Sequence, residues 1–266
     1  MDVAGPPRGT PAGAGPGRAR RRPFLTARWE HLVLLNYACP AALLAPLVPA
    51  GTTLDAWQGQ TLVSLVGFRF EDTRLAGIPI PGHRSFDEVN LRFYVRRTAL
   101  DGSVRRAVVF IRELVPRLAI ATIARWLYNE PYLSVPMGHA IDLDPRTGGA
   151  VAYRWRHRGQ RFTIGASVSG PAQALVPGSE AEFITEHYWG YTRQRDGGTL
   201  EYEVIHPRWA VWAADSARFE GAADRLYGPD FAHLLSGAPQ SAFVAVGSPV
   251  SVFRGTRLDL SAPRGQ

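Results

Sequence analysis

The stretch EVNLRFYV, residues 88–95, shows the pattern on which the fold prediction rests. Its odd-numbered positions are all apolar, whereas its even-numbered positions carry Glu88, Asn90, Arg92 and Tyr94. Successive side chains of a β-strand point to opposite faces of a sheet, so this period of two predicts a strand with one apolar face. Asp101-Gly102 is a typical hairpin turn, after which residues 105–112 are predicted to return as a second strand.

The same period recurs on both sides of this hairpin. Further strands are predicted at 31–37, 61–70, 151–168 (a hairpin), 188–193, 200–205, 209–219, 241–246 and 250–254. Helical spacing is clearest over 116–128, and shorter helices are predicted at 40–47, 179–187, 222–226 and 231–235. About ten strands, mostly joined by hairpins, predict a mostly β (α+β) fold in which an antiparallel meander forms a partly closed β-barrel with a few helices.

Composition excludes several kinds of chemistry. The sequence has 266 residues and 30 basic side chains, and every one of them is Arg. Without lysine, no P-loop lysine and no side-chain amine for a Schiff base is available. The single cysteine, Cys39, cannot form an internal disulfide, and the seven histidines show no metal-ligand spacing. We therefore expect no cofactor and no metal site.

The charge is uneven along the chain. Residues 1–22 hold five Arg and one Asp, together with many Pro and Gly residues, so that 1–23 is predicted to be a disordered basic arm. RRPFL, residues 21–25, resembles a twin-arginine export signal, but charged and polar residues interrupt the apolar stretch that should follow. No run is long enough to span a bilayer. We expect a cytoplasmic protein with no membrane association, a single domain over 24–258 and a C-terminal tail over 259–266.

Candidate site residues lie on the polar side of the first strand and near two later turns. Glu88, Asn90 and Arg92 share one face, about 7 Å apart in steps of two residues. If this face points into the barrel, Arg92 could bind a carboxylate through its guanidinium fork, whereas the alternative is a face exposed to solvent. Arg112 and Glu113 follow an apolar strand, and they are either a structural ion pair or a site in which a desolvated Glu113 acts as acid or base.

An aromatic stretch, HYWGY at 187–191, offers a second group of candidates. His187 and Tyr191 could line a pocket, because pockets combine apolar walls with a few polar groups. The alternative is that this stretch is an ordinary strand with its aromatic residues in the core. No signature of a serine or cysteine nucleophile is present around 165–170 or Cys39.

Several segments together resemble the YqjF-like family of uncharacterised bacterial proteins (domain of unknown function 2071). They are TARW (26–29), LLNY (34–37), LVPAGT (47–52), SLVGF (64–68), EVNLR (88–92), LYNEPY (127–132) and HYWGY (187–191). This family is placed in the acetoacetate-decarboxylase-like superfamily, so the resemblance implies a β-barrel that encloses a small cavity. It covers roughly residues 24–255.

The resemblance also implies what this chain cannot do. The decarboxylases form a Schiff base on a lysine that follows an Arg-Glu pair, and the similar position here reads Arg112-Glu113 and then Pro116-Arg117-Leu118. A guanidinium stays protonated and cannot replace that amine, so decarboxylation through an imine on lysine is excluded. The pocket carboxylate of those enzymes resembles Glu88, within Phe86-Asp87-Glu88, which favours an interior position for it.

Two functions are compatible with these features. The first is a barrel protein that binds a small organic acid or keto compound in an enclosed cavity, with lyase- or isomerase-like acid–base chemistry through Glu88 and Glu113 and ligand contacts from Asn90, Arg92, Arg112, His187 and Tyr191. The second is a non-catalytic ligand-binding or interaction protein on the same fold. Association with nucleic acid through residues 8–22 is less favoured, because the charge of the folded part is only mildly basic. The sequence leaves the oligomeric state open.

Overall fold

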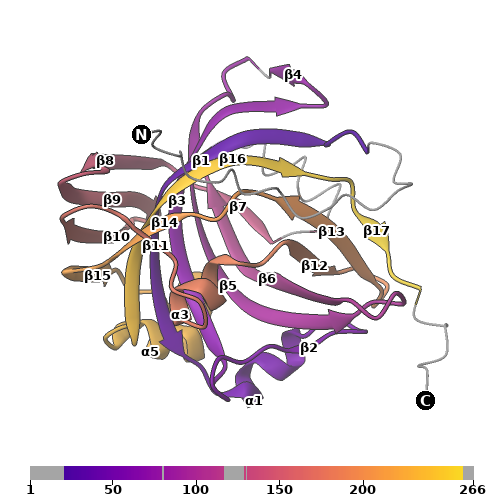
Figure 1. Ribbon diagram of the computed structural model, residues 1–266. Helices are drawn as coiled ribbons and strands as arrows, with labels where there is room; N and C mark the ends of the chain where they lie inside the picture. The colour runs from indigo at the N-terminus through magenta and orange to yellow at the C-terminus, as the bar shows by residue number, and fades with distance from the viewer. Residues whose placement is uncertain (1–20, 80, 117–128, 130, 260–266) are drawn as a thin grey trace, which may run out of the picture.

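The computed structural model describes residues 21–79, 81–116, 129 and 131–259, and within them strands dominate (Figure 1). A large sheet contains 13 strands, and a smaller sheet of four strands packs beside it. The predicted mostly β fold with a few helices is confirmed. The predicted helix 116–128 lies outside the described residues apart from Pro116, and so do nearly all of the N-terminal arm and the C-terminal tail.

The large sheet closes partly on itself. Its central order is β16-β1-β3-β5-β6-β12-β13, and a short pairing of Val204 and Ile205 with Val252 and Ser251 returns from β13 to β16. We call this closed path the ring. The strands of the large sheet are β1 (Leu25–Ala38), β2 (Thr53–Leu54), β3 (Leu62–Leu75), β4 (Ile78–Pro79), β5 (Phe86–Thr98), β6 (Val104–Val115), β7 (Tyr132–Ser134), β11 (Gln173–Ala174), β12 (Trp189–Arg193), β13 (Thr199–Ile205), β14 (Ala210–Ala213), β16 (Ser241–Val252) and β17 (Thr256–Arg257).

The small sheet lies against the outer side of the ring (Figure 1). Short helices join the apolar cluster on this outer side through Leu44, Leu226 and Phe231, whereas Phe183 and Ile184 of another short helix pack inside the ring. The small sheet is antiparallel throughout, in the order β15 (Ser216–Glu220), β10 (Gln160–Ser169), β9 (Gly148–His157) and β8 (Met137–Asp144). The helices are α1 (Ala41–Leu44), the 3₁₀ turn η1 (Ala45–Leu47), α3 (Glu180–Thr185), α4 (Asp224–Tyr227) and α5 (Pro229–Ser236). Ser179 caps α3 as its spacing to Glu182 predicts, because its hydroxyl accepts a hydrogen bond from the Glu182 amide.

The alternation in β5 separates two apolar clusters. Its odd-numbered residues from Val89 to Val95 pack between the ring and the small sheet, together with Tyr153 and Trp155 of β9. Its even-numbered side faces the inside of the ring, where Tyr94 joins a second cluster with Phe68 and Phe86. Both faces of β5 are therefore buried, and the solvent-exposed alternative for its polar face is wrong.

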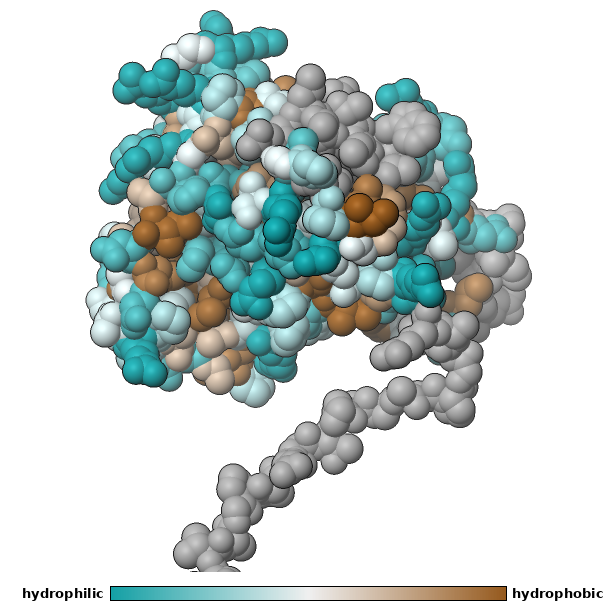
Figure 2. All heavy atoms as spheres, turned by 90° about the horizontal axis from the view of Figure 1, so that it is seen from above, coloured by the Kyte–Doolittle hydropathy of each residue, from teal (hydrophilic) through white to brown (hydrophobic). Residues whose placement is uncertain are grey.

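On the face shown in Figure 2, the apolar residues of the described part of the chain are scattered among hydrophilic ones and do not form a large exposed apolar cluster. The large apolar side chains that are exposed, such as Ile78, Leu100 and Val176, come from separate loops and strand ends. Single exposed apolar residues are normal on soluble proteins. Within the described residues, no helix is long and apolar enough to cross a membrane.

Three strand predictions need correction. Residues 209–219 are not one strand but two, because β14 pairs with β16 in the large sheet while β15 pairs with β10 in the small one. The two strands predicted at 241–246 and 250–254 are one strand, β16, which ends at Val252 and stays paired with β1 across Gly247. Gly247 has φ 90°, and a Cβ there would lie 1.9 Å from the Trp29 carbonyl oxygen, so only glycine allows this continuation. The meander is also not entirely antiparallel, since β6 pairs in parallel with β12 and β7.

The contact between the two sheets depends on one missing side chain. Gly67 in β3 lies beneath the Tyr153 ring, and a Cβ at Gly67 would stand 2.7 Å from Tyr153 Cδ2 and 3.0 Å from Ile164 Cγ2. The Tyr153 hydroxyl meanwhile donates to the His31 carbonyl oxygen at 2.9 Å. The ring therefore has little freedom to move aside.

We expect Gly67→Ala to lower the free energy of unfolding by about 1–3 kcal/mol, the usual cost of overpacking a filled core. Gly138→Ala in β8 is the matched control, because a Cβ there has no heavy atom within 4 Å. The control should be neutral or slightly stabilising, since alanine restricts the unfolded chain. Urea unfolding of both variants measures the difference, and equal effects would contradict this account of the sheet contact.

Candidate functional site

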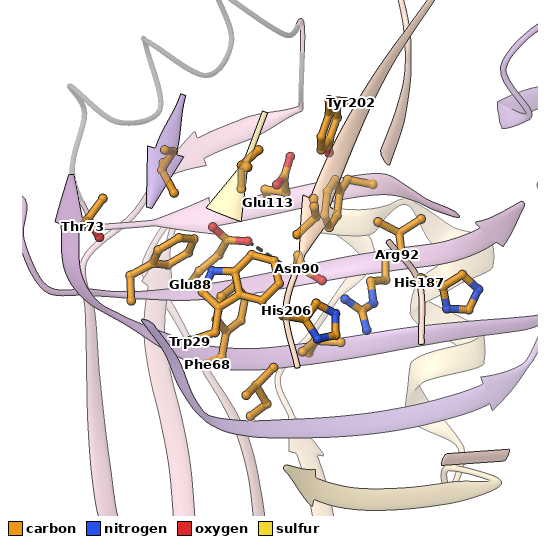
Figure 3. Close-up of a pocket in the computed structure, with 18 of the residues that line it drawn as sticks. Trp29, Phe68, Thr73, Glu88, Asn90, Arg92, Glu113, His187, Tyr202 and His206 are labelled. Carbon is orange, nitrogen blue, oxygen red and sulfur yellow. Dashed lines mark hydrogen bonds between the residues drawn. The ribbon is translucent and has the colours of Figure 1, made fainter. Parts of the chain in front are cut away.

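A cavity of about 170 Å³ lies inside the ring, and β5 forms one of its walls (Figure 3). Its walls are mainly apolar and aromatic, and polar groups are concentrated on β5 and on the segments that face it. The aromatic lining residues are Phe24, Trp29, Phe68, Phe70, Phe86, Phe110, Trp189, Tyr202 and Trp209. The polar lining residues are Thr73, His83, Glu88, Asn90, Arg92, Glu113, Tyr132, Thr185, His187 and His206.

Glu88 is the central acidic group of this cavity. Its side chain is buried, Asn90 Nδ2 donates to Oε1 at 3.0 Å, and the Tyr132 hydroxyl donates to Oε2 at 3.3 Å. Burial raises the pKa of Glu88 to about 7, although these two hydrogen bonds and the charge of Arg92 lower it in part. A carboxyl group with such a pKa can both take up and release a proton near neutral pH.

Glu113 reaches the same cavity because β6 contains a bulge. Asn90 pairs with Glu113 and Leu91 with Arg112, but Arg92 pairs with Phe110, so Ile111 is the extra residue. Phe110 and Glu113, three positions apart, therefore both line the cavity. Figure 3 shows Glu113 on the same side of the strand pair as Glu88, and the register places the two carboxyl groups as diagonal neighbours.

Arg92 and His187 form the other end of the polar strip (Figure 3). Arg92 donates from Nη2 to the Ile184 carbonyl oxygen at 3.5 Å, while its buried Nε has no partner among the described residues. Burial, followed by the charges of Arg106 and Arg92, lowers the pKa of His187 well below its ordinary value. His187 Nε2 lies 3.9 Å from a carboxylate oxygen of Asp55, which Arg106 Nε binds at 2.8 Å. His187 is therefore neutral at pH 7 beside a paired carboxylate.

Five of the seven predicted site residues are brought together here: Glu88, Asn90, Arg92, Glu113 and His187. The other two are not. Arg112 is on the outer face of the ring, where its charge acts on Tyr227 and His157: burial raises the pKa of Tyr227 and Arg112 opposes that rise, whereas burial and nearby arginines, Arg112 among them, lower the pKa of His157. The bulge at Ile111 explains this placement, because it puts Arg112 opposite Leu91 of the outer apolar cluster.

Tyr191 also lies outside the cavity. Its hydroxyl donates to Glu201 Oε2 at 2.5 Å, and Arg105 and Arg97 pair with the same carboxylate. Its ring is part of the outer apolar cluster. The neighbouring Gly190 has a different role, since a Cβ there would lie 2.1 Å from Tyr202 Cζ. Gly190 thus leaves room for the Tyr202 ring at the cavity wall.

Several polar contributors were not predicted from the sequence, among them Trp29, Tyr132 and His206. The buried Nε1 of Trp29 has no acceptor among the described residues. His206 stacks on Trp209 with ring centroids 4.3 Å apart, its Nδ1 lies 2.9 Å from the Pro207 carbonyl oxygen, and burial lowers its pKa. These residues come from β1, from the start of β7 and from the loop after β13, so only the closed ring brings them to one site.

The described residues contain no group of three or more His, Cys, Asp or Glu side chains arranged to hold a metal ion. The polar groups of the cavity are instead a mixture of carboxyl, amide, guanidinium and neutral imidazole groups among aromatic walls. Such a mixture suits a small organic ligand with an apolar part and one or two oxygen atoms.

Several solved structures with a similar fold are of enzymes. The chain superimposes on an acetoacetate decarboxylase-like enzyme from Sphingomonas wittichii RW1 with a TM-score of 0.63 at 17% identity, covering 88% of this chain and 93% of the other. The enduracididine biosynthesis enzyme MppR complexed with pyruvate gives a TM-score of 0.63 at 15% identity, over 92% and 94% of the two chains. Acetoacetate decarboxylase from Legionella pneumophila gives 0.61 at 13% identity, over 95% and 94%. At these identities the similarity establishes the fold alone.

Sequence comparison is more specific. The uncharacterised protein YqjF of Bacillus subtilis (strain 168) is 28% identical over 196 residues, which are 72% of this chain and 75% of YqjF. The model of the family described as "Uncharacterized conserved protein", DUF2071, matches residues 26–249. Because that match covers most of the sequence, the chain belongs to the DUF2071 family, on an acetoacetate-decarboxylase-like fold.

Proposed function

We propose that this protein binds a small organic acid or keto compound in the ring cavity, with Glu88 as the acid–base group and Arg92 as the group that binds the ligand's anionic or carbonyl oxygen. The observation that carries this proposal is the burial of Glu88 in an aromatic cavity, with the pKa of its carboxyl group raised to about 7. Such an environment is costly for a purely structural carboxylate, and it is what proton transfer near neutral pH requires.

The size and polarity of the cavity support the same ligand class. A volume of about 170 Å³ is close to the ~150 Å³ of an engineered cavity that holds benzene, so the ligand is a small molecule rather than a polymer. Arg92 and neutral His187 can orient an oxygen at one end, while Glu88 and Glu113 stand at the other. The MppR neighbour is complexed with pyruvate, which makes pyruvate a rational first probe.

The chemistry cannot involve an imine on a side-chain amine, since the sequence has no lysine. A guanidinium such as that of Arg92 cannot replace an amine as the nucleophile. We therefore propose lyase- or isomerase-like proton transfer by Glu88, with Glu113 as the second carboxyl group. Arg92 would stabilise negative charge that develops on the ligand oxygen.

We expect Glu88→Gln to weaken binding of small 2-oxo and 2-hydroxy acids by about tenfold or more, and to abolish any turnover, without unfolding the protein. Glutamine keeps the shape of the side chain but can neither ionise nor transfer a proton. Ligand-observed NMR with pyruvate and lactate measures affinity, and mass spectrometry of the incubated acids detects products.

The matched control is Glu220→Gln, a carboxylate of β15 that is 61% exposed and paired with Arg218 on the small sheet. It should leave affinity unchanged. Binding without product in the wild type would identify a non-catalytic ligand-binding protein, which is the alternative on this fold. Unchanged affinity in Glu88→Gln would contradict the assignment of Glu88 to the site.

The raised pKa of Glu88 also predicts a pH dependence of stability. The carboxyl group of a glutamate in the unfolded chain has a pKa near 4.5, whereas the pKa of folded Glu88 is about 7, so between these values the folded state holds the proton more tightly. The free energy of unfolding must therefore fall as pH rises through this window. The wild type should lose up to roughly 3 kcal/mol more than Glu88→Gln between pH 4.5 and 7.5.

Urea unfolding of both proteins at a series of pH values measures this difference. Glu220→Gln should follow the wild-type curve, because its carboxyl group is solvated. Parallel curves for the wild type and Glu88→Gln would show that burial does not shift the titration of Glu88.

A further inference from the structure

The side-chain amide of Asn90 has a defined orientation at the cavity wall. Asn90 is 1% exposed, and its Nδ2 donates to Glu88 Oε1 at 3.0 Å. An ionised carboxylate only accepts hydrogen bonds, so Glu88, when it is ionised at a pH above its pKa of about 7, fixes which end of the amide carries the nitrogen. The carbonyl oxygen Oδ1 is then left without a partner among the described residues.

An unpaired, buried carbonyl oxygen is costly, because it has lost its hydrogen bonds to water. Asn90 lines the cavity, so a bound molecule can restore that bond. Oδ1 can only accept, and a ligand must therefore donate to it from an O–H or N–H group. A keto oxygen cannot do so, since it is itself an acceptor.

Arg92, which lies two residues further along the same face of β5, has the opposite requirement. Arg92 Nε is a buried donor with no partner among the described residues, and it calls for an acceptor such as a carboxylate oxygen. Acceptor and donor thus follow one another along the polar face at the ~7 Å repeat of a strand. A carboxylate with a hydroxyl group on the adjacent carbon matches this order.

We propose that Asn90 makes the cavity selective for small 2-hydroxy acids over the corresponding 2-oxo acids, with the ligand hydroxyl donating to Asn90 Oδ1 and the carboxylate accepting from Arg92. This inference rests on the proposed function, since it names the ligand class of the same cavity. Asn90 is here a specificity-determining residue, distinct from the acid–base role of Glu88.

Matched ligands test this selectivity directly. Ligand-observed NMR at pH 8.5, where Glu88 is ionised, should give about tenfold tighter binding of lactate than of pyruvate, and the same order for 2-hydroxybutanoate over 2-oxobutanoate. 2-Methoxypropanoate keeps the oxygen of lactate but lacks its O–H donor, and it should lose the advantage. Equal or tighter binding of the 2-oxo acids would overturn the proposal while leaving the proposed function intact.

Variants then assign the effect to Asn90. Asn90→Leu removes the acceptor with little change in shape, and the ratio of the lactate and pyruvate affinities should fall to near one. Asn36→Ala is the control, because Asn36 is a buried amide outside the cavity whose side chain bonds to Ser64 and Ser241. It should lower the melting temperature but preserve the ratio.

Three further results would overturn the proposal. An unchanged ratio in Asn90→Leu would exclude Asn90 as the cause of selectivity. If the wild type binds 2-methoxypropanoate as tightly as lactate, the ligand hydroxyl does not donate a hydrogen bond to Asn90. This result needs no substitution and therefore holds even if Asn90→Leu fails to fold. Binding of neither acid class by the wild type would remove the proposed function and this inference together.

Discussion

Burial of both faces of β5 is the constraint on which the rest of the structure depends. One face supplies the apolar residues that join the ring to the small sheet, and the other supplies Glu88, Asn90 and Arg92 to the cavity. A strand with a polar face is normally placed with that face toward solvent. Here the ring closes over it through β13 and β16, so the polar groups must be satisfied by one another or by a ligand.

That constraint explains the local chemistry of the site. Glu88 receives hydrogen bonds from Asn90 and Tyr132, yet burial outweighs them and leaves its pKa raised. Asp55 is another buried carboxylate, and the guanidinium of Arg106 binds it at 2.8 Å. The two carboxyl groups therefore have distinct environments: one is paired with a cation, and the other has mainly neutral donors. Acid–base function is expected of the second kind.

The sequence predicts which face of the sheet a side chain occupies wherever the strand is regular, because there the period of two alone determines the face. The strict alternation of 88–95 predicts which residues of β5 share a face, and that prediction holds because β5 has no bulge of its own opposite β3. The bulge in β6 defeats the same reasoning, because one extra residue exchanges the faces of Arg112 and Glu113. A bulge at Ile111 has no glycine or proline to mark it, and so neither residue could be assigned a face from the sequence.

Closure of the ring is the other feature beyond local sequence. Trp29, Tyr132 and His206 belong to segments that are each unremarkable as strand ends or loops, and the register of distant strands alone brings them to the cavity. Gly190 shows why such long-range contacts cannot be predicted from local sequence. Within HYWGY it is one small residue among aromatic ones, and only the structure shows that the Tyr202 ring occupies the space left by its missing side chain.

The absence of lysine gives this cavity a different chemical character from one built around an amine. An arginine can hold negative charge on a ligand but cannot form a covalent bond to a carbonyl carbon, so a keto group has no special advantage at such a site. What remains is discrimination by hydrogen bonding, in which each buried donor and acceptor selects its complement. In this cavity the carbonyl oxygen of Asn90 is an acceptor oriented by Glu88, and therefore the ionisation of one residue fixes the hydrogen-bonding preference of the other.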